Sequence, residues 1–148
     1  MKILGLDTAT HKCGYALFHD DELIDSGVWK LKGDLDMRLA QLLSYLTEFC
    51  ATELPDLVAL EVPFVHPRMR KDTAIRLGEA VGVVKGWAFS HGVSTLDVYP
   101  SQAKRAVSGS GKATKHGVQE AVKWRFGIEA EEDQADAIAV AMAALHSG

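Results

Sequence analysis

Short stretches in which apolar residues alternate with other residues open the chain and predict strands. Residues 2–7 place apolar side chains on both faces, as in a strand that is covered on both sides. Two similar stretches follow at residues 13–19 and 23–31, and the acidic tripeptide Asp20-Asp21-Glu22 between them predicts a short hairpin loop. The chain is therefore expected to begin with three consecutive strands.

The rest of the chain alternates between helical spacing and short apolar runs. Residues 34–50 place leucines three and four positions apart and predict a helix, whereas the apolar run at 57–62, closed by Pro63, predicts a central strand. Three glycines spaced four residues apart give the predicted helix at 73–89 a flat stripe, which allows close approach to the sheet or to a second subunit. The remaining predicted elements are a strand at 93–99, a helix that Ser101 caps and that ends at Val107, a basic loop at 108–115, and helices at 115–126 and 131–146.

Three strands in a row, followed by strands that alternate with helices, predict a mixed sheet. Strands joined by hairpins pair antiparallel, and strands joined by a crossover helix pair parallel. We therefore expect an α/β protein with a mixed five-stranded sheet flanked by helices, formed by a single domain over residues 1–148. This order of elements is similar to that of the ribonuclease H-like fold.

The composition excludes several classes of protein. With 47% apolar and 24% charged residues, the chain is too hydrophobic for a disordered protein. Its charge-free apolar stretch at residues 138–145 is far shorter than the roughly 18–20 residues that cross a bilayer, and its start lacks the apolar region of a signal peptide. Cys13 and Cys50 are too few for a disulfide scaffold. We expect a cytoplasmic protein with two reduced thiols and no membrane partner.

Charge is unevenly distributed along the chain. The net charge of −4 argues at first against a polyanionic partner. Residues 66–125, however, hold 11 of the 16 basic residues and 4 of the 20 acidic residues, a net charge of +7, and the remaining residues carry −11. Such segregation can direct one face toward phosphates, and a solvated basic face without a partner is the alternative.

Four carboxylates carry the candidate chemistry. Asp7 and Glu61 each end an apolar strand, where a carboxylate is costly unless it is paired, hydrogen-bonded or bound to a metal. Asp133 and Asp136 lie three residues apart and share one face of a helix that can pack near those strand ends. Four carboxylates without a cysteine or histidine cluster favour Mg²⁺ or Mn²⁺, and a pair of such ions can hydrolyse a phosphodiester. Taken singly, each acid also fits an ordinary role as a turn residue, a rim residue or a helix N-terminal acid.

Motifs along nearly the whole chain resemble those of the RuvC-type Holliday junction resolvases, and their order and spacing agree together. The motifs are Ile3-Leu4-Gly5-Leu6-Asp7 with Gly14, Leu60-Glu61 with Phe64, Leu77-Gly78-Glu79-Ala80-Val81-Gly82, Tyr99-Pro100-Ser101 through Lys104, Lys115-His116-Gly117-Val118-Gln119, and Asp133-Gln134-Ala135-Asp136-Ala137-Ile138-Ala139. The resemblance implies a ribonuclease H-like homodimer that makes two symmetric Mg²⁺-dependent nicks in opposing strands of a four-way DNA junction. It also implies a bacterial or phage-encoded protein, with a branch-migration helicase as a candidate partner.

The same resemblance assigns roles to individual residues. The four acids correspond to the family's metal-binding residues, with two ions in each active site. Lys104 and Lys115 correspond to basic positions that contact DNA. Phe64 corresponds to an aromatic residue that stacks on an unpaired base near the junction centre, an interaction worth about 1–3 kcal/mol; an ordinary core phenylalanine is the alternative. The basic segment is expected to supply further DNA contacts through Arg68, Arg70, Lys71, Arg76 and Lys112.

Three other functions compete with the resolvase. One is a DNA-binding protein that has lost catalysis, and the presence of all four acids counts against it. The segment Asp7-Thr8-Ala9-Thr10 also resembles the phosphate-1 loop of actin-like ATPases and related tRNA-modification proteins, which would make the chain a non-catalytic nucleotide-binding module. That function predicts a second Asp/Gly phosphate loop and a second similar domain, and the 148 residues contain neither. The third alternative is a ribonuclease H-like nuclease for other branched DNA, because the four acids alone do not select a junction.

Overall fold

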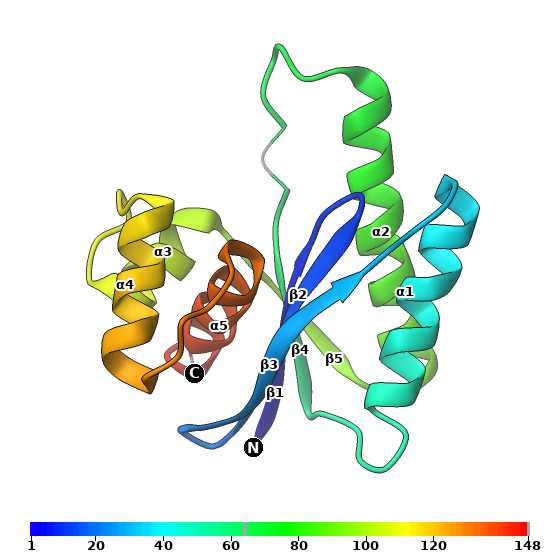
Figure 1. Ribbon diagram of the computed structural model, residues 1–148. Coiled ribbons are helices and arrows are strands. Elements are labelled where there is room, and N and C mark those ends of the chain that lie inside the picture. Colours follow the sequence, from blue (N-terminus) through cyan, green and yellow to red (C-terminus); the bar gives the residue numbers. More distant parts are fainter. Residues whose placement is uncertain (64, 148) are drawn as a thin grey trace.

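The computed structural model describes residues 1–63 and 65–147 and has one five-stranded sheet between two layers of helices (Figure 1). The strands are β1 (Lys2–Thr8), β2 (Lys12–His19), β3 (Glu22–Lys30), β4 (Leu57–Glu61) and β5 (Ser94–Val98), and the helices are α1 (Leu35–Phe49), α2 (Lys71–Ser90), α3 (Pro100–Ser108), α4 (Lys115–Phe126) and α5 (Glu132–Leu145). The strand order is β3-β2-β1-β4-β5, antiparallel from β3 to β1 and parallel from β1 to β5. The predicted α/β architecture with a mixed sheet is confirmed. None of the helices in the described part of the chain combines the length and apolar character that a membrane crossing requires.

Different helices cover the two faces of the sheet. Helices α1 and α2 lie on one face, and α3, α4 and α5 lie on the other (Figure 1). Because side chains alternate along a strand, Leu4 and Leu6 of β1 belong to the apolar cluster under α1 and α2, whereas Ile3 belongs to the cluster under α5. The central strands are thus buried on both faces, which fixes the position of residues at their carboxyl ends.

Helix α5 lies very close to the sheet because a glycine faces it. A Cβ atom at Gly14 of β2 would collide with the backbone oxygen of Asp133 in the first turn of α5. The neighbouring Gln134 donates a hydrogen bond of 2.9 Å from Nε2 to Oγ of Ser26 on β3. The alanine-rich helix is buried along most of its length. Its N-terminal turn is therefore held against β2, beside the end of β1.

Gly14→Ala is expected to lower the free energy of unfolding by about 1–3 kcal/mol, because the added methyl group forces β2 and α5 apart. Urea denaturation followed by circular dichroism measures the change. The matched control is Gly78→Ala in α2, where a Cβ meets open space and alanine has the higher helix propensity. If Gly14→Ala and the unmodified protein unfold at the same urea concentration, the close contact between β2 and α5 is wrong.

The predicted helix boundaries differ from the structure at α2 and α3. Helix α2 begins at Lys71, two residues before the predicted start at Thr73. Helix α3 is capped by Tyr99, so the prediction that Ser101 caps it is wrong: the Tyr99 N–H donates a hydrogen bond of 2.9 Å to Oε1 of Gln102. Pro100 is the first helical residue, a position where its missing N–H has no helical partner to lose.

The glycine stripe of α2 faces away from the sheet. A Cβ atom at Gly78, Gly82 or Gly86 would meet nothing within 4 Å, so of the two alternatives for this stripe the chain's own sheet is excluded. The three glycines lie on an exposed face together with Ile75 and Phe89. The stripe therefore leaves a flat, solvent-facing surface on α2.

Candidate active site

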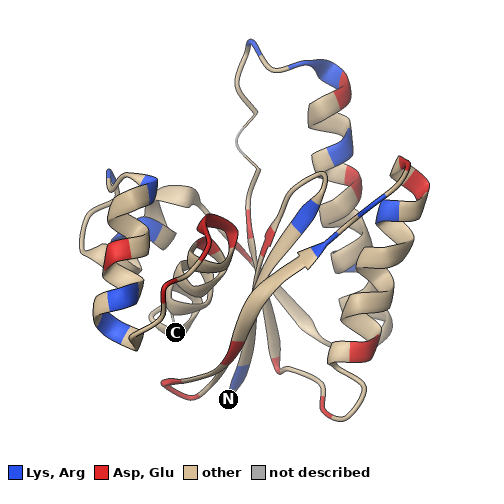
Figure 2. Cartoon of the chain, viewed as in Figure 1, with Lys and Arg blue, Asp and Glu red and all other residues tan. Residues whose placement is uncertain are grey.

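The four acids of the candidate site come from three elements that meet at one edge of the sheet. Asp7 and Glu61 occupy the next register position after the last residue pair of the parallel strands β1 and β4. Asp133 and Asp136 lie in the first two turns of α5, whose N-terminus packs on β2. Figure 2 shows acidic residues gathered where α5 begins, beside the strand ends. The structure therefore brings together all four acids that the sequence singled out.

A single cleft of about 300 Å³ contains these acids. Lys104 of α3 and Lys115 of α4 line the same cleft, so four acidic residues and two lysines surround one small space. The remaining lining residues are Val62, Pro100, Ala103, Val118 and Ala139. Such a cleft can bind cations at its acids and a phosphate at its lysines.

Three of the acids are close enough to share a cation. One carboxylate oxygen from each of Asp7, Asp133 and Asp136 lies within 4.8 Å of the other two. The donors are all carboxylate oxygens, which suit hard divalent cations such as Mg²⁺ or Mn²⁺. The cluster therefore fits a divalent cation.

Burial and neighbouring like charges disfavour the ionised forms of two of the acids. Burial, followed by the charge of Glu61, raises the pKa of Asp7 well above its ordinary value, and the protonated carboxyl donates a hydrogen bond to Glu61. Burial and the charges of Glu61 and Asp133 raise the pKa of Asp136 to about 6, although Lys115 opposes this shift. A divalent cation bound among these acids would offset the same like charges.

The free energy of unfolding in EDTA is expected to fall as the pH rises from about 5 to 8, by about 1–2 kcal/mol from Asp136 alone. The raised pKa of Asp136 means that its proton stabilises the folded chain at low pH, and this contribution is lost as the pH passes through about 6. The raised pKa of Asp7 continues the loss at higher pH.

Thermal melts across this pH range measure the loss of stability, and the pH dependence should be weaker in the Asp7→Asn variant. Saturating Mg²⁺ should restore stability at the higher pH. A melting temperature in EDTA that increases with pH would contradict the raised pKa values.

The predicted DNA-binding lysines of the two short helices and their loop divide into two groups. Lys104 and Lys115 line the acidic cleft, and Nζ of Lys115 lies 3.4 Å from Oε2 of Glu132. Lys112 lies in the loop between α3 and α4 and is not among the described residues that line the cleft. Lys104 and Lys115 therefore lie beside the acids, whereas Lys112 lies outside the cleft lining.

The other predicted basic residues lie on the loop before α2 and on its first turns. Arg68, Arg70, Lys71 and Arg76 follow one another along this segment, and Nε of Arg70 lies 3.3 Å from Oδ1 of Asp72. Figure 2 shows this basic segment rising from the same end of the sheet as the acids. The predicted stacking residue Phe64 lies outside the described residues.

Comparison with known proteins identifies the family of this chain. The family model described as crossover junction endodeoxyribonuclease RuvC matches residues 3–144. The chain belongs to the RuvC family. The crossover junction endodeoxyribonuclease RuvC of Chromohalobacter salexigens is 32% identical over 147 residues, covering 95% of this chain and 78% of the relative. That of Trichlorobacter lovleyi is 35% identical over 155 residues, covering 99% of this chain and 86% of the relative. The resemblance inferred from the motifs is confirmed.

Solved RuvC structures have the same fold as this RuvC-family chain. Thermus thermophilus RuvC matches with a TM-score of 0.82 and 25% identity, covering 99% of this chain and 95% of that chain. T. thermophilus RuvC in complex with a Holliday junction substrate matches with a TM-score of 0.83 and 23% identity over the same shares. The yeast mitochondrial Holliday junction resolvase Ydc2 matches with a TM-score of 0.68 and 16% identity, covering 97% and 77%. The predicted ribonuclease H-like fold is confirmed.

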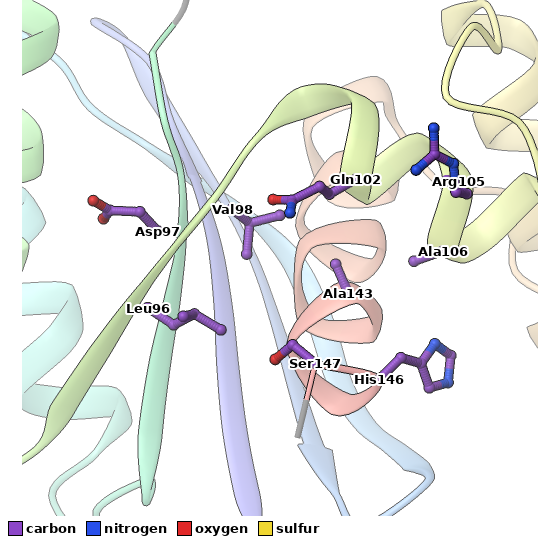
Figure 3. Close-up of a pocket in the computed structure, with 9 residues that line it drawn as sticks. All are labelled: Leu96, Asp97, Val98, Gln102, Arg105, Ala106, Ala143, His146 and Ser147. Atoms are coloured by element: carbon purple, nitrogen blue, oxygen red, sulfur yellow. The ribbon is translucent and has the colours of Figure 1, made fainter.

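A second pocket of this RuvC-family chain lacks converging charges. It has a volume of about 460 Å³ and lies between β5, α3 and the end of α5. Figure 3 shows the apolar side chains of Leu96, Val98 and Ala143 facing its centre, while the charged side chains of Asp97 and Arg105 point away. The acidic cleft is therefore the better candidate for chemistry.

One residue next to the RuvC acids was not singled out from the sequence. Nζ of Lys12 lies 2.8 Å from Oδ2 of Asp133. Lys12 precedes Gly14 by two residues on β2, so the two residues share a face of the strand. The alternation of side chains along a strand could have singled out Lys12 from the sequence. It does so, however, only once Gly14 is known to face α5.

Proposed function

We propose that this RuvC-family chain is a structure-selective endodeoxyribonuclease that resolves four-way DNA (Holliday) junctions by paired symmetric nicks. The observation that carries the proposal is the cleft in which four carboxylates converge beside Lys104 and Lys115. The family, described as crossover junction endodeoxyribonucleases, supports junction DNA as the substrate. On the same family basis we propose a single catalytic domain, a cytoplasmic location and a branch-migration helicase as a partner.

In the proposed site, Asp7, Glu61, Asp133 and Asp136 would hold two Mg²⁺ ions, and Mn²⁺ suits the same oxygen ligands. When bound, such a pair supplies an activated water molecule and stabilises the leaving oxygen of a phosphodiester. The chain itself contributes rigid placement of the ligands, because two buried strands carry two of the acids and α5 carries the other two. A phosphate in the cleft is oriented by the ammonium groups of Lys104 and Lys115.

The remaining predicted residues extend the proposed DNA surface beyond the cleft. The junction arms are contacted by Arg68, Arg70, Lys71, Arg76 and Lys112. Phe64 stacks on an unpaired base near the junction centre. The position of the loop before α2 supports its place in the proposed DNA surface, because the loop rises from the same end of the sheet as the acids (Figure 2).

The proposal is tested with labelled DNA substrates of equal length: a mobile four-way junction, a fork, a flap and a linear duplex, each with and without Mg²⁺. We expect paired nicks in the junction alone, and only with the metal. Equal cleavage of forks or flaps would instead indicate a general nuclease for branched DNA. Binding to the junction without cleavage in Mg²⁺ would indicate a non-catalytic module.

Symmetric nicking requires two active sites, so we propose that the protein acts as a homodimer. The exposed face of α2 supports this proposal. Ile75 and Phe89, whose side chains are 61% and 88% exposed, lie at the two ends of the glycine stripe. Large exposed apolar side chains gain stability when another chain buries them. The glycines between them let the backbone of that chain approach closely.

Gly82→Leu in the middle of the stripe is expected to weaken dimerisation by about tenfold or more, because the added side chain separates the two copies at an energetic cost of about 1–3 kcal/mol. Sedimentation equilibrium measures the dissociation constant. Circular dichroism serves as the control, since a Cβ at this position meets open space within the protomer and the fold should persist. An unchanged dissociation constant would remove α2 from the proposed interface.

A further inference from the structure

Lys12 brings a positive charge to the rim of the acidic cleft. Its ammonium nitrogen lies 2.8 Å from Oδ2 of Asp133, and the Lys12 side chain is 51% exposed while that of Asp133 is 15% exposed. Asp133 is one of the three acids whose carboxylate oxygens lie close enough to share a cation. Lys12 therefore contacts a proposed metal ligand from the solvent side.

The segments that carry Lys12 and Asp133 are both held in place by neighbouring contacts. Lys12 and Gly14 share a face of β2, and the first turn of α5 packs directly on Gly14. The hydrogen bond from Gln134 to Ser26 holds the same turn of α5 against β3. On the other side, the Ala9 N–H donates a hydrogen bond of 2.9 Å to the Lys12 carbonyl and closes the turn before β2. The ion pair thus joins two anchored segments.

Lys12 is half-exposed and therefore positively charged at neutral pH, and its ammonium nitrogen contacts the Asp133 carboxylate directly. A cation that binds to Asp133 therefore meets an ammonium group that already occupies one oxygen of that carboxylate. Like charges at such short range repel each other even at the high dielectric constant of water.

We propose that Lys12 is a positioning residue of the nuclease site, which competes with divalent cations for Asp133. The inference rests on the proposed metal site. In the free protein, Lys12 offsets part of the charge of the acids and lowers their affinity for cations. Lys12 thereby sets the concentration of Mg²⁺ that the enzyme requires.

The test is a titration of the DNA-free protein with Mn²⁺, followed by the paramagnetic resonance signal of free Mn²⁺. Lys12→Met keeps the apolar stem and removes the charge, so it is expected to bind Mn²⁺ about three- to tenfold more tightly. Lys12→Arg keeps the charge and should bind like the unmodified protein. Lys30→Met is the matched control, because Lys30 pairs with Lys12 across β2 and β3 but lies one strand further from β1, so a smaller change is expected.

A second readout is the Mg²⁺ concentration that gives half-maximal junction cleavage, which should fall in Lys12→Met by the same factor. Lys12→Gln provides a second neutral variant, and circular dichroism verifies that each variant folds.

Equal or weaker Mn²⁺ binding by both neutral variants would overturn the inference, since an ion pair that only anchors α5 would weaken the site when lost. Equal tightening by Lys30→Met would also overturn it, because overall charge would then explain the effect. If the unmodified protein binds no Mn²⁺, the proposed metal site fails, and the inference fails with it. The failures are distinguishable, since only the last abolishes Mn²⁺ binding by the unmodified protein.

Discussion

Asp7→Asn is expected to reduce the rate of junction cleavage in Mg²⁺ by about 10³-fold or more, which corresponds to about 4 kcal/mol of transition-state stabilisation. Asp7 is buried at the centre of the cluster, where its carboxylate contacts Glu61 and lies near Asp133 and Asp136. The amide has the same shape but neither the charge nor the second anionic oxygen. Single-turnover cleavage of a labelled junction measures the loss.

Junction binding by Asp7→Asn should change by less than about threefold, because the basic residues that are proposed to contact phosphates are untouched. A gel-shift titration in Ca²⁺ or EDTA measures the affinity separately from cleavage. Asp21→Asn is the matched control, since Asp21 is an exposed acid in the β2–β3 turn and its loss should leave cleavage unchanged. Cleavage by Asp7→Asn at the rate of the unmodified protein would remove Asp7 from the proposed metal site.

The affinity for a four-way junction is expected to fall by about 10³-fold between roughly 50 and 200 mM salt, if the protein contacts about six phosphates of the DNA. The physical reason is the release of counterions from DNA when lysines and arginines neutralise its phosphates. The segment 66–125 supplies this charge, with a net value of +7 in a chain of net charge −4. Affinities of the cleavage-deficient Asp7→Asn protein at five or six salt concentrations give the slope.

Single substitutions then show how much each basic residue contributes to the salt dependence of the affinity. Lys104→Ala, in the cleft, should reduce the slope of log affinity against log salt by about 1 for each copy that contacts a phosphate. Lys123→Ala serves as the control, because Lys123 lies in the last turn of α4, where its Nζ is 2.8 Å from Oε1 of Glu129. An affinity that is insensitive to salt would contradict phosphate contacts in the basic segment.

The order of the elements and the convergence of the acids could be predicted because both depend on local signals. Alternation, helical spacing and prolines determine where strands and helices lie, and the crossover rules determine how the strands pair. Asp7 and Glu61 were recognisable as carboxylates at the ends of apolar strands. The closeness of Asp133 and Asp136 to them followed from the resemblance to a known family and from the packing of α5 near the strand ends.

Other features depend on contacts between distant segments and could not be derived from the pattern. Gly14 and Gly82 look alike in sequence, yet Gly14 faces the backbone of α5 and Gly82 faces open space. The ion pair between Lys12 and Asp133 joins residues far apart in the chain and depends on how closely α5 approaches β2. The cap of α3 was misassigned because Ser101 is the better general cap, whereas the backbone of Tyr99 pairs with the Gln102 side chain and Pro100 suits the first turn.

The division of the acids between the two ends of the chain has a practical consequence. Asp7 and Glu61 come from strands in the first half, while Asp133 and Asp136 come from the last helix, and the loop between α3 and α4 separates the two pairs. A chain cut in that loop would yield two fragments, each with two of the four proposed metal ligands, and neither fragment is expected to cut DNA by itself. Because α5 docks through a glycine-lined contact and a buried face, bringing the fragments together would rebuild both the core and the site. This topology is suited to a split nuclease whose activity reports that its two parts have met.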